Sequence, residues 1–407
     1  GAHKWDVDGH KYICYYNGHG ASILGYSNPV ISEAVKEQID KGTHYSACHE
    51  LEIELAERIQ KLFPMAEKLR FTGSGTEANM MAIRLSRAAT GRQKIIKFQG
   101  HFHGWWDHLA MGISSPFDQP ATAGLLPDDV KYTIVLPVND EKALGKALSK
   151  RDVAAAIFEG AGCHVGQVPV DPKFAQAARD LCTKYGTVLI FDEVITGFRW
   201  SPGGWQATIG VKPDLTTLAK ILMGALPGGV VAGKAEILDM IQHRDDDPNW
   251  NRFNRVSHPG TFNANPLSTA AGIAAMKLIE TGEPQRKADA MALKLRTGMH
   301  GIIQERGIEG AAYGDASVFH VYIGPCDRPT TEYSPLPPTS ADNILEDGMS
   351  QAVRAGIARN FLFNGIHSLH LGFTSISHSD EDVGRTLEVF GESLDAMIAD
   401  GTIKPRA

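Results

Sequence analysis

Short apolar runs alternate with amphipathic stretches through the middle of this chain. Each run is four or five residues long, the length of a strand buried on both faces. The runs cover residues 69–72, 95–98, 133–136, 154–158, 188–192, 215–219 and 230–233. Strands that alternate with helical spacing favour a largely parallel sheet between helices. The pattern therefore predicts an α/β fold.

The two ends of the chain are patterned differently. Residues 5–16 alternate around Asp8-Gly9, which is typical of a hairpin turn. Helical spacing covers residues 29–40, 49–62, 266–281 and 380–398, residues 318–323 are typical of a strand, and residues 325–340 of a surface loop. We predict a large domain over residues 43–262 and a smaller α+β domain built from residues 1–42 and 263–407.

Composition excludes several classes of partner. The 407 residues carry a net charge of −7, so no general attraction to nucleic acid is expected. No apolar stretch reaches the roughly 20 residues of a membrane-spanning helix. The five cysteines are scattered and odd in number, without CxxC spacing. Free thiols in a reducing cytoplasm are therefore expected.

Two of the apolar runs end in chemically useful residues. The run 188–192 ends in Asp192, and the run 215–219 is followed by Lys220. Ligands of open α/β sheets bind at the carboxyl ends of the strands. A carboxylate and an amine there suit pyridoxal phosphate (PLP), whose aldehyde forms a Schiff base with lysine and whose ring nitrogen an aspartate keeps protonated. The alternatives are a helix cap for Asp192 and a surface charge for Lys220.

A turn of small residues follows the predicted strand of residues 69–72. Thr72-Gly73-Ser74-Gly75-Thr76 opens a helical stretch. Backbone N–H groups at a helix N-terminus bind phosphate, and small residues let the phosphate approach. By itself such a sequence is also typical of a simple turn. Together with Asp192 and Lys220, it favours a phosphate site.

Four motifs in this order resemble one known family. They cover residues 71–79, 99–108, 188–199 with Lys220, and 258–266. They resemble the class III, fold-type I PLP-dependent aminotransferases, in the branch of glutamate-1-semialdehyde aminomutase and the D-phenylglycine-type aminotransferases. The resemblance runs from about Trp5 to the C-terminus. It implies a large domain with a mostly parallel sheet and a smaller α+β domain.

The resemblance also implies roles for single residues. Ser74, Gly75 and Thr76 match the phosphate cup of the family. Phe102 matches the aromatic residue that stacks on the PLP ring, a position that is most often Tyr in relatives. Val194 matches the residue that packs on the other face of the ring. Glu159 matches a glutamate near the active site, although relatives usually have Pro after it and this chain has Gly160.

Further implications concern the assembly. Thr261 matches a threonine that reaches the phosphate of the neighbouring subunit, which implies a homodimer with shared active sites. Asn265-Pro266 is also typical of the start of a helix, and this role is compatible with a contact between Thr261 and the neighbouring subunit. The segment from Gly1 resembles an internal hairpin of the family, so some tens of residues are expected before it, including the substrate-binding arginine of the aminomutases.

The histidines of residues 99–108 raise the question of a metal site. His101, His103 and His108 are close in sequence, but zinc usually takes four ligands, and no further Cys or His stands at a suitable spacing. We predict no metal and expect packing near the cofactor for at least one of these histidines.

The leading function hypothesis is a PLP-dependent aminotransferase. It would move an amino group by a ping-pong mechanism between a small-molecule amino donor, of a D-, β- or arylglycine type, and a keto acid acceptor. The alternative is intramolecular transfer of the glutamate-1-semialdehyde 2,1-aminomutase type. His370 stands where aminomutases have a glutamate, which counts against this alternative. Residues 112–127 correspond to a gating loop, and Trp105 and Trp106 favour a bulky substrate. A PLP racemase or a relative without turnover is the third reading.

Overall fold

The computed structural model describes residues 1–120, 122–331 and 334–406. These residues form two compact units. The larger unit comprises residues 30–165 and 170–280, and the smaller unit comprises residues 1–29, 166–169 and 281–407. No helix within the described part of the chain is long and apolar enough to cross a membrane.

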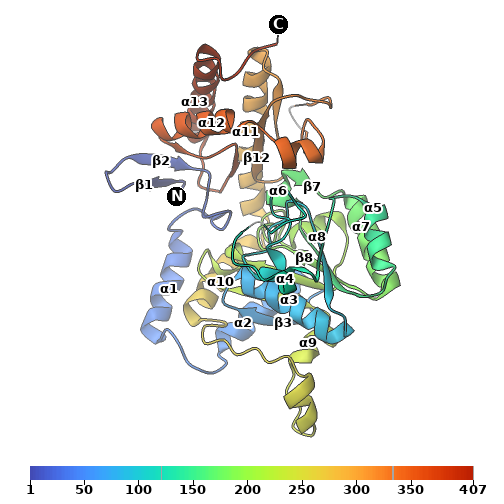
Figure 1. Cartoon of the computed structure of the whole chain (residues 1–407). Coiled ribbons are helices and arrows are strands. Elements are labelled where there is room, and N and C mark those ends of the chain that lie inside the picture. The colour runs from blue at the N-terminus through green and yellow to red at the C-terminus, as the bar shows by residue number, and fades with distance from the viewer. Residues whose placement is uncertain (121, 332–333, 407) are drawn as a thin grey trace. The chain divides into compact units, whose positions relative to one another are not determined.

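A seven-stranded sheet is the centre of the larger unit (Figure 1). In spatial order its strands are β3 (Lys68–Thr72), β10 (Gly229–Gly233), β9 (Leu215–Ala219), β8 (Val188–Asp192), β6 (Val153–Glu159), β4 (Lys94–Phe98) and β5 (Thr133–Leu136). Strand β10 is antiparallel to both of its neighbours, and the other pairs are parallel. All seven predicted strands are present within one residue at each end, so the α/β prediction is confirmed.

Helices surround this sheet. The helices of the larger unit are α1 (Pro29–Lys41), α2 (Glu50–Leu62), α3 (Gly75–Thr90), α4 (Pro127–Val130), α5 (Glu141–Leu148), α7 (Pro172–Tyr185), α8 (Gly204–Ile209), α9 (Ala235–Leu238) and α10 (Pro266–Ile279), with α6 (Cys163–Gly166) at its boundary. Helix α3 packs against β6, β8, β9 and β10, while α5 and α7 lie side by side (Figure 1). Burial of α3 fixes its first turn at the edge of the sheet.

Helix α10 belongs with the larger unit. It packs against α2 and against the short 3₁₀ turn Lys220–Met223. Eleven of its residues are buried, including Ala271 and Gly272, which contact the turn through their backbone. The sequence pattern placed this helix in the small domain of residues 263–407. Its apolar character instead serves the packing beneath the Lys220 turn.

The smaller unit has two short sheets and three long helices. Strands β1 (His3–Trp5), β2 (Lys11–Cys14) and β13 (Ile366–His367) form one sheet, and β11 (Gly310–Tyr313), β12 (Val318–Ile323) and β14 (Leu371–Phe373) form the other. Its helices are α11 (Glu283–Glu305), α12 (Gln351–Phe363) and α13 (Asp380–Ala399), and β7 (Val168–Pro169) also belongs to it. This is the expected α+β composition. Within the loop predicted over residues 325–340, Glu332 and Tyr333 lie outside the described residues.

Candidate active site

Polar residues line up across three neighbouring strands. Glu159 at the end of β6 is in register with Asp192 at the end of β8, and Asp192 is in register with Thr217 of β9. Lys220 follows Ala219, the last residue of β9. The structure therefore places Asp192 and Lys220 at one edge of the sheet, where the strand pattern predicts them.

The carboxylate of Asp192 is buried and held from several directions. Its Oδ2 accepts a hydrogen bond from Asn79 Nδ2 at 2.8 Å and lies 2.7 Å from His103 Nδ1. Its Oδ1 accepts from the backbone N–H of Val194 at 3.0 Å. Thr217 Oγ1 donates to Asn79 Oδ1 at 2.7 Å and so orients the amide. The same hydroxyl also lies 3.4 Å from Oδ1 of Asp192.

The neighbouring histidine fits this arrangement in its neutral form. His103 is buried, and burial lowers its pKa, although the hydrogen bond to Asp192 acts in the opposite direction. Since a carboxylate has no proton to donate, Nδ1 of the neutral ring is the donor. Nε2 then has no hydrogen-bond partner among the described residues. His103 thus fixes the carboxylate without adding a positive charge.

Lys220 has an unusual backbone and a shifted pKa. Its φ of +56° lies in the left-handed region, which a side chain with a Cβ rarely adopts and which costs of the order of 1 kcal/mol or more. Burial lowers the pKa of its ammonium from 10.5 to about 8; the carboxylates of Asp192 and Glu159 act in the opposite direction, and Arg199 lowers the pKa further. An amine with these properties is a candidate nucleophile and base.

The predicted phosphate cup forms the first turn of α3. Ser74 is the N-cap, and its Oγ accepts from the N–H of Glu77 at 3.2 Å. A Cβ on Gly75 would lie 3.0 Å from both γ-carbons of Val194 and 3.5 Å from Cβ of Ala219. The structure therefore brings Gly75, Val194 and the residue before Lys220 into contact. Gly75 lets the helix N-terminus approach this position closely.

The segment after β4 presents Phe102. Its side chain is 49% exposed, while its backbone N–H donates to Oε1 of Glu159 at 2.7 Å. The backbone N–H of Glu159 in turn donates to Nδ1 of His101 at 2.9 Å. Glu159, whose role the sequence left open, therefore ties this segment to the sheet. Gly104 passes so close to Thr76 that a Cβ there would lie 2.3 Å from Oγ1.

Thr261 lies apart from these contacts. It is exposed and lines a pocket of about 640 Å³ together with Gly73 and Glu77, beside the first turn of α3. Phe262, which follows it, is 67% exposed and lines the same pocket. The expected contact of Thr261 with a neighbouring subunit stays a prediction.

Sequence reasoning missed several members of the site. Asn79 and Thr217 were not singled out, although Asn79 lies one helical turn after Gly75 and Thr217 two residues before Ala219 on the same face of the strand. The helical spacing of four residues and the strand spacing of two residues were the patterns from which these positions could have been predicted. His103 was considered only as a metal ligand or a packing residue. Arg199 is wholly buried and acts on Lys220, and no local pattern indicated this.

His108 and Trp106 have structural contacts, whereas Trp105 is largely exposed. His108 Nδ1 lies 2.7 Å from the carbonyl oxygen of Asp129. Trp106 packs against a hydrophobic cluster of the core, whereas Trp105 is 81% exposed. The hypothesis of a bulky substrate assumed that the two tryptophans act as a pair. Their different surroundings do not support that assumption. In the described part of the chain, the group of three or more possible metal ligands is the exposed set Asp6, Asp8 and His10.

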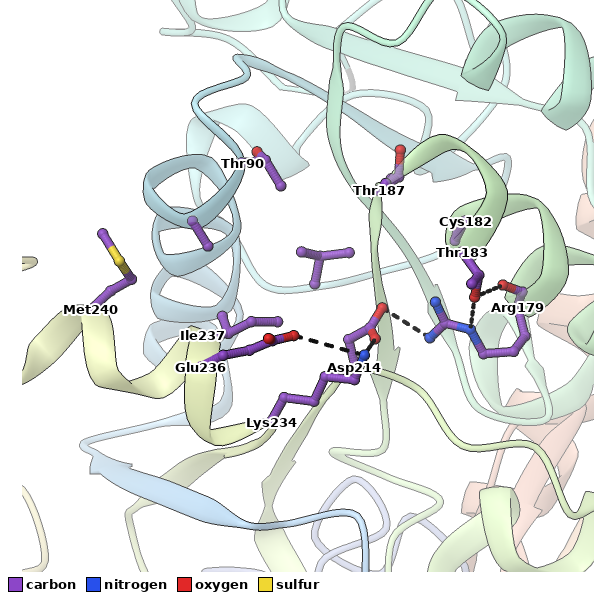
Figure 2. Close-up of a pocket in the computed structure, with 13 residues that line it drawn as sticks. Thr90, Arg179, Cys182, Thr183, Thr187, Asp214, Lys234, Glu236, Ile237 and Met240 are labelled. Atoms are coloured by element: carbon purple, nitrogen blue, oxygen red, sulfur yellow. Dashed lines mark hydrogen bonds and ion pairs between the residues drawn. The ribbon is translucent and has the colours of Figure 1, made fainter.

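A second pocket lies at the opposite edge of the sheet. It has a volume of about 430 Å³ and contains Val188, the first residue of β8, which is about 13 Å along the strand from Asp192. Figure 2 shows Asp214 between Arg179 and Lys234. Their ion pairs with Asp214 have distances of 2.9 and 2.8 Å. Because these charges already pair with each other, this pocket is an ion-pair network remote from Lys220.

Comparison with known proteins assigns the family. A sequence model of the class-III aminotransferases matches residues 1–309, that is, 309 of the 407 residues. The chain belongs to the class-III aminotransferases. Enzymes of this class use PLP as their cofactor. The family prediction, the enzyme prediction and the cofactor prediction are therefore confirmed.

Individual class-III enzymes are similar over nearly the whole chain. The glutamate-1-semialdehyde 2,1-aminomutase of Archaeoglobus fulgidus is 37% identical over 397 residues, which cover 97% of this chain and 91% of that protein. The structure of an ω-transaminase from Sphaerobacter thermophilus has a TM-score of 0.85 and 31% identity, over 97% of this chain and 89% of that one. A β-phenylalanine aminotransferase from Variovorax paradoxus has a TM-score of 0.83 and 30% identity, over 100% and 87% of the two chains. These similarities confirm the fold-type I architecture.

The residues of this class-III aminotransferase fit PLP. The first turn of α3 offers backbone N–H groups, and Gly75 leaves room beside Val194. The carboxylate of Asp192 suits a protonated ring nitrogen, and the amine of Lys220 suits an aldehyde. The donor set and the missing Cβ thus agree with the chemistry of this cofactor.

Proposed function

We propose that this chain catalyses PLP-dependent amino transfer with Lys220 and Asp192 as its catalytic residues. The observation that carries the proposal is that a buried amine of lowered pKa and a buried, firmly held carboxylate share a sheet edge. Ser74, Gly75 and Thr76 would hold the phosphate. Phe102 and Val194 would contact the two faces of the ring.

When bound, PLP supplies an aldehyde that joins amines and a ring that takes up the electron pair of the carbon next to nitrogen. Lys220 in its neutral form has a lone pair at Nζ, so it takes a proton from the substrate carbon and returns it at another position. Asp192 would place its negative charge beside the ring nitrogen and would keep that nitrogen protonated. Asn79 and His103 hold Oδ2 of the carboxylate in place for this task.

For the substrate, we propose transfer within one molecule, of the glutamate-1-semialdehyde 2,1-aminomutase type. The support is the similarity to the A. fulgidus protein of that name over nearly all of both chains. The sequence patterns alone led us to prefer transfer between two molecules, and the comparisons favour the alternative. An aminomutase must retain its intermediate, which gives residues 112–127 a role as a gate. Met111 and Pro120 pair at the base of this segment, and Ala121 lies outside the described residues.

The second candidate is transfer from an amino donor to a separate keto acid. It is supported by the similarity to the ω-transaminase and the β-phenylalanine aminotransferase. It is also supported by His370, which stands where the aminomutases have a glutamate. His370 lies between β13 and β14, and its carbonyl oxygen accepts a hydrogen bond from Val321.

One experiment separates the two candidates. The PLP-loaded enzyme is incubated with glutamate-1-semialdehyde alone, and in parallel with β-phenylalanine and 2-oxoglutarate. We expect the semialdehyde to be converted without an acceptor into the isomer whose amine is on the neighbouring carbon. Glutamate formed only in the second mixture would favour the second candidate. Bound PLP without turnover in either mixture would contradict both substrate proposals.

We further propose a homodimer in the cytoplasm. Exposure of Thr261 and of the apolar Phe262 beside the first turn of α3 supports a partner subunit that covers this surface. All five cysteines are free, which supports a reducing compartment. Sedimentation equilibrium with and without PLP tests the oligomeric state, and a monomer that retains full activity would contradict shared active sites.

A further inference from the structure

Strand β4 contains a lysine without access to solvent. Lys97 is 0% exposed and is among the largest fully buried side chains of the described residues. Its Nζ donates hydrogen bonds to the carbonyl oxygens of His101 at 2.9 Å and Leu109 at 2.8 Å. Burial of an ammonium is costly, and an apolar side chain of similar size would fill the same space without that cost. The amine is therefore expected to have a task.

The two carbonyl groups bracket the segment that carries Phe102 and His103. The same segment has further ties: Phe102 N–H donates to Glu159 Oε1, and Asn79 Nδ2 donates to the carbonyl oxygen of His103 at 3.1 Å. These two ties act on residues 102 and 103 themselves. Lys97 binds both ends of residues 101–109 at once, and just outside them the backbone N–H of Gly100 donates to the carbonyl oxygen of Gly112 at 2.8 Å.

We propose that Lys97 is a positioning residue for the cofactor: its ammonium holds residues 101–109 in the shape that presents Phe102 to the PLP ring and His103 to Asp192. This inference rests on the use of PLP by the chain. Lys97 does not touch the site that it serves. It acts through the backbone of the segment, so its loss weakens PLP binding.

The charge of Lys97 makes this effect dependent on pH. Burial lowers its pKa to about 7, while the carboxylate of Glu159 from β6 acts in the opposite direction. His103 in the tied segment also interacts with the Lys97 charge, which lowers the pKa of His103. Below pH 7 the ammonium makes charge-assisted hydrogen bonds, which are roughly twice as strong as neutral ones. Above that pH the amine is neutral and the tether weakens.

The test compares Lys97→Met with a matched control on the same strand. Lys94→Met removes a lysine of β4 whose Nζ pairs with Asp152 at 2.6 Å near the surface. The dissociation constant of PLP is measured for each apoenzyme between pH 6 and 9. We expect Lys97→Met to bind PLP about tenfold more weakly than wild type at pH 6 and at most about threefold more weakly at pH 9. Lys94→Met should stay within about twofold of wild type at each pH.

The ratio between variant and wild type is the decisive quantity, because ionisation of PLP and of Lys220 is common to both proteins. A ratio that is constant with pH, or a ratio below about two at pH 6, would overturn the inference. If Lys97→Met does not fold, amide exchange of the wild-type apoenzyme replaces it. After correction for intrinsic exchange rates, the protection of residues 99–109 relative to that of β6 should then be lower at pH 9 than at pH 6. Equal relative protection at the two pH values overturns the inference.

The outcome is also distinguishable from failure of the cofactor assignment. If wild type and Lys94→Met both fail to bind PLP, the assignment of the cofactor site is wrong. If both bind it and Lys97→Met binds it equally well, only the role of Lys97 is wrong.

Discussion

The lowered pKa of Lys220 predicts how the apoenzyme takes up PLP at different pH. Only a neutral amine attacks an aldehyde, and the pKa falls from 10.5 to about 8 through burial. At pH 7 about one amine in ten is then neutral, against about three in ten thousand for an ordinary lysine. The rate of covalent uptake at pH 7 should therefore exceed that of a solvent-exposed lysine by about two to three orders of magnitude, and it should level off above pH 8.

Glu159→Gln is the perturbation that tests the origin of this pKa. The amide oxygen of Gln still accepts the hydrogen bond of the Phe102 N–H, while the negative charge that raises the pKa of Lys220 is lost. We expect the midpoint of the pH–rate curve to move down by about one unit. Uptake at pH 7 would then become faster, although the substitution removes a buried carboxylate from the site.

Stopped-flow absorbance of apoenzyme mixed with PLP measures this rate from pH 6 to 10. Lys220→Ala is the control, because it should bind PLP without covalent uptake at any pH. A midpoint near 10.5 in wild type would refute the claim that burial lowers the pKa of Lys220. A midpoint that stays fixed or rises in Glu159→Gln would refute the electrostatic contribution of Glu159.

Three further predictions follow from the site. Asp192→Asn keeps the shape but loses the charge beside the ring nitrogen, so kcat should fall at least about a hundredfold; a loss below threefold in a steady-state assay would count against its role. Gly75→Ala places a methyl group against Val194, so PLP should bind about tenfold more weakly by fluorescence titration, whereas Gly301→Ala in open space on α11 should leave it unchanged. If Thr261 serves the neighbouring subunit, co-expressed Thr261→Ala and Lys220→Ala chains should regain about half of the wild-type activity per mixed dimer, because one of its two sites is intact; mixed dimers as inactive as both parents would exclude this exchange.

The sequence predicted the strands of the central sheet well, because these strands follow from local patterns. Runs such as 188–192 and 215–219 are mostly apolar, and both are strands in the structure with the same bounds. The position of Asp192 and Lys220 followed, since a residue at the end of a parallel strand lies at the common edge. The antiparallel direction of β10 was not predicted, because its apolar residues suit a buried strand of either direction.

Contacts between distant segments were beyond the reach of these patterns. Asn79 and Asp192 are separated by 113 positions, and Lys97 closes a loop through backbone carbonyls that any residue type would provide. The apolar spacing of residues 266–281 predicted a helix correctly, but it carried no information on which unit the helix joins. Packing against α2 decides this, and such packing depends on the shapes of both partners.

The row formed by Glu159, Asp192 and Thr217 has a consequence for how this sheet tolerates change. Strands β8 and β9 are buried along their whole length, so apolar residues alone do not distinguish one alignment of the strands from an alignment shifted by one position. The polar row does, because a shift would leave its carboxylates facing apolar neighbours. Deletion of one residue within β8 would thus preserve hydrophobicity and still abolish folding into this sheet. The groups that serve the reaction also keep the strands aligned, which ties the evolution of the catalytic edge to that of the scaffold.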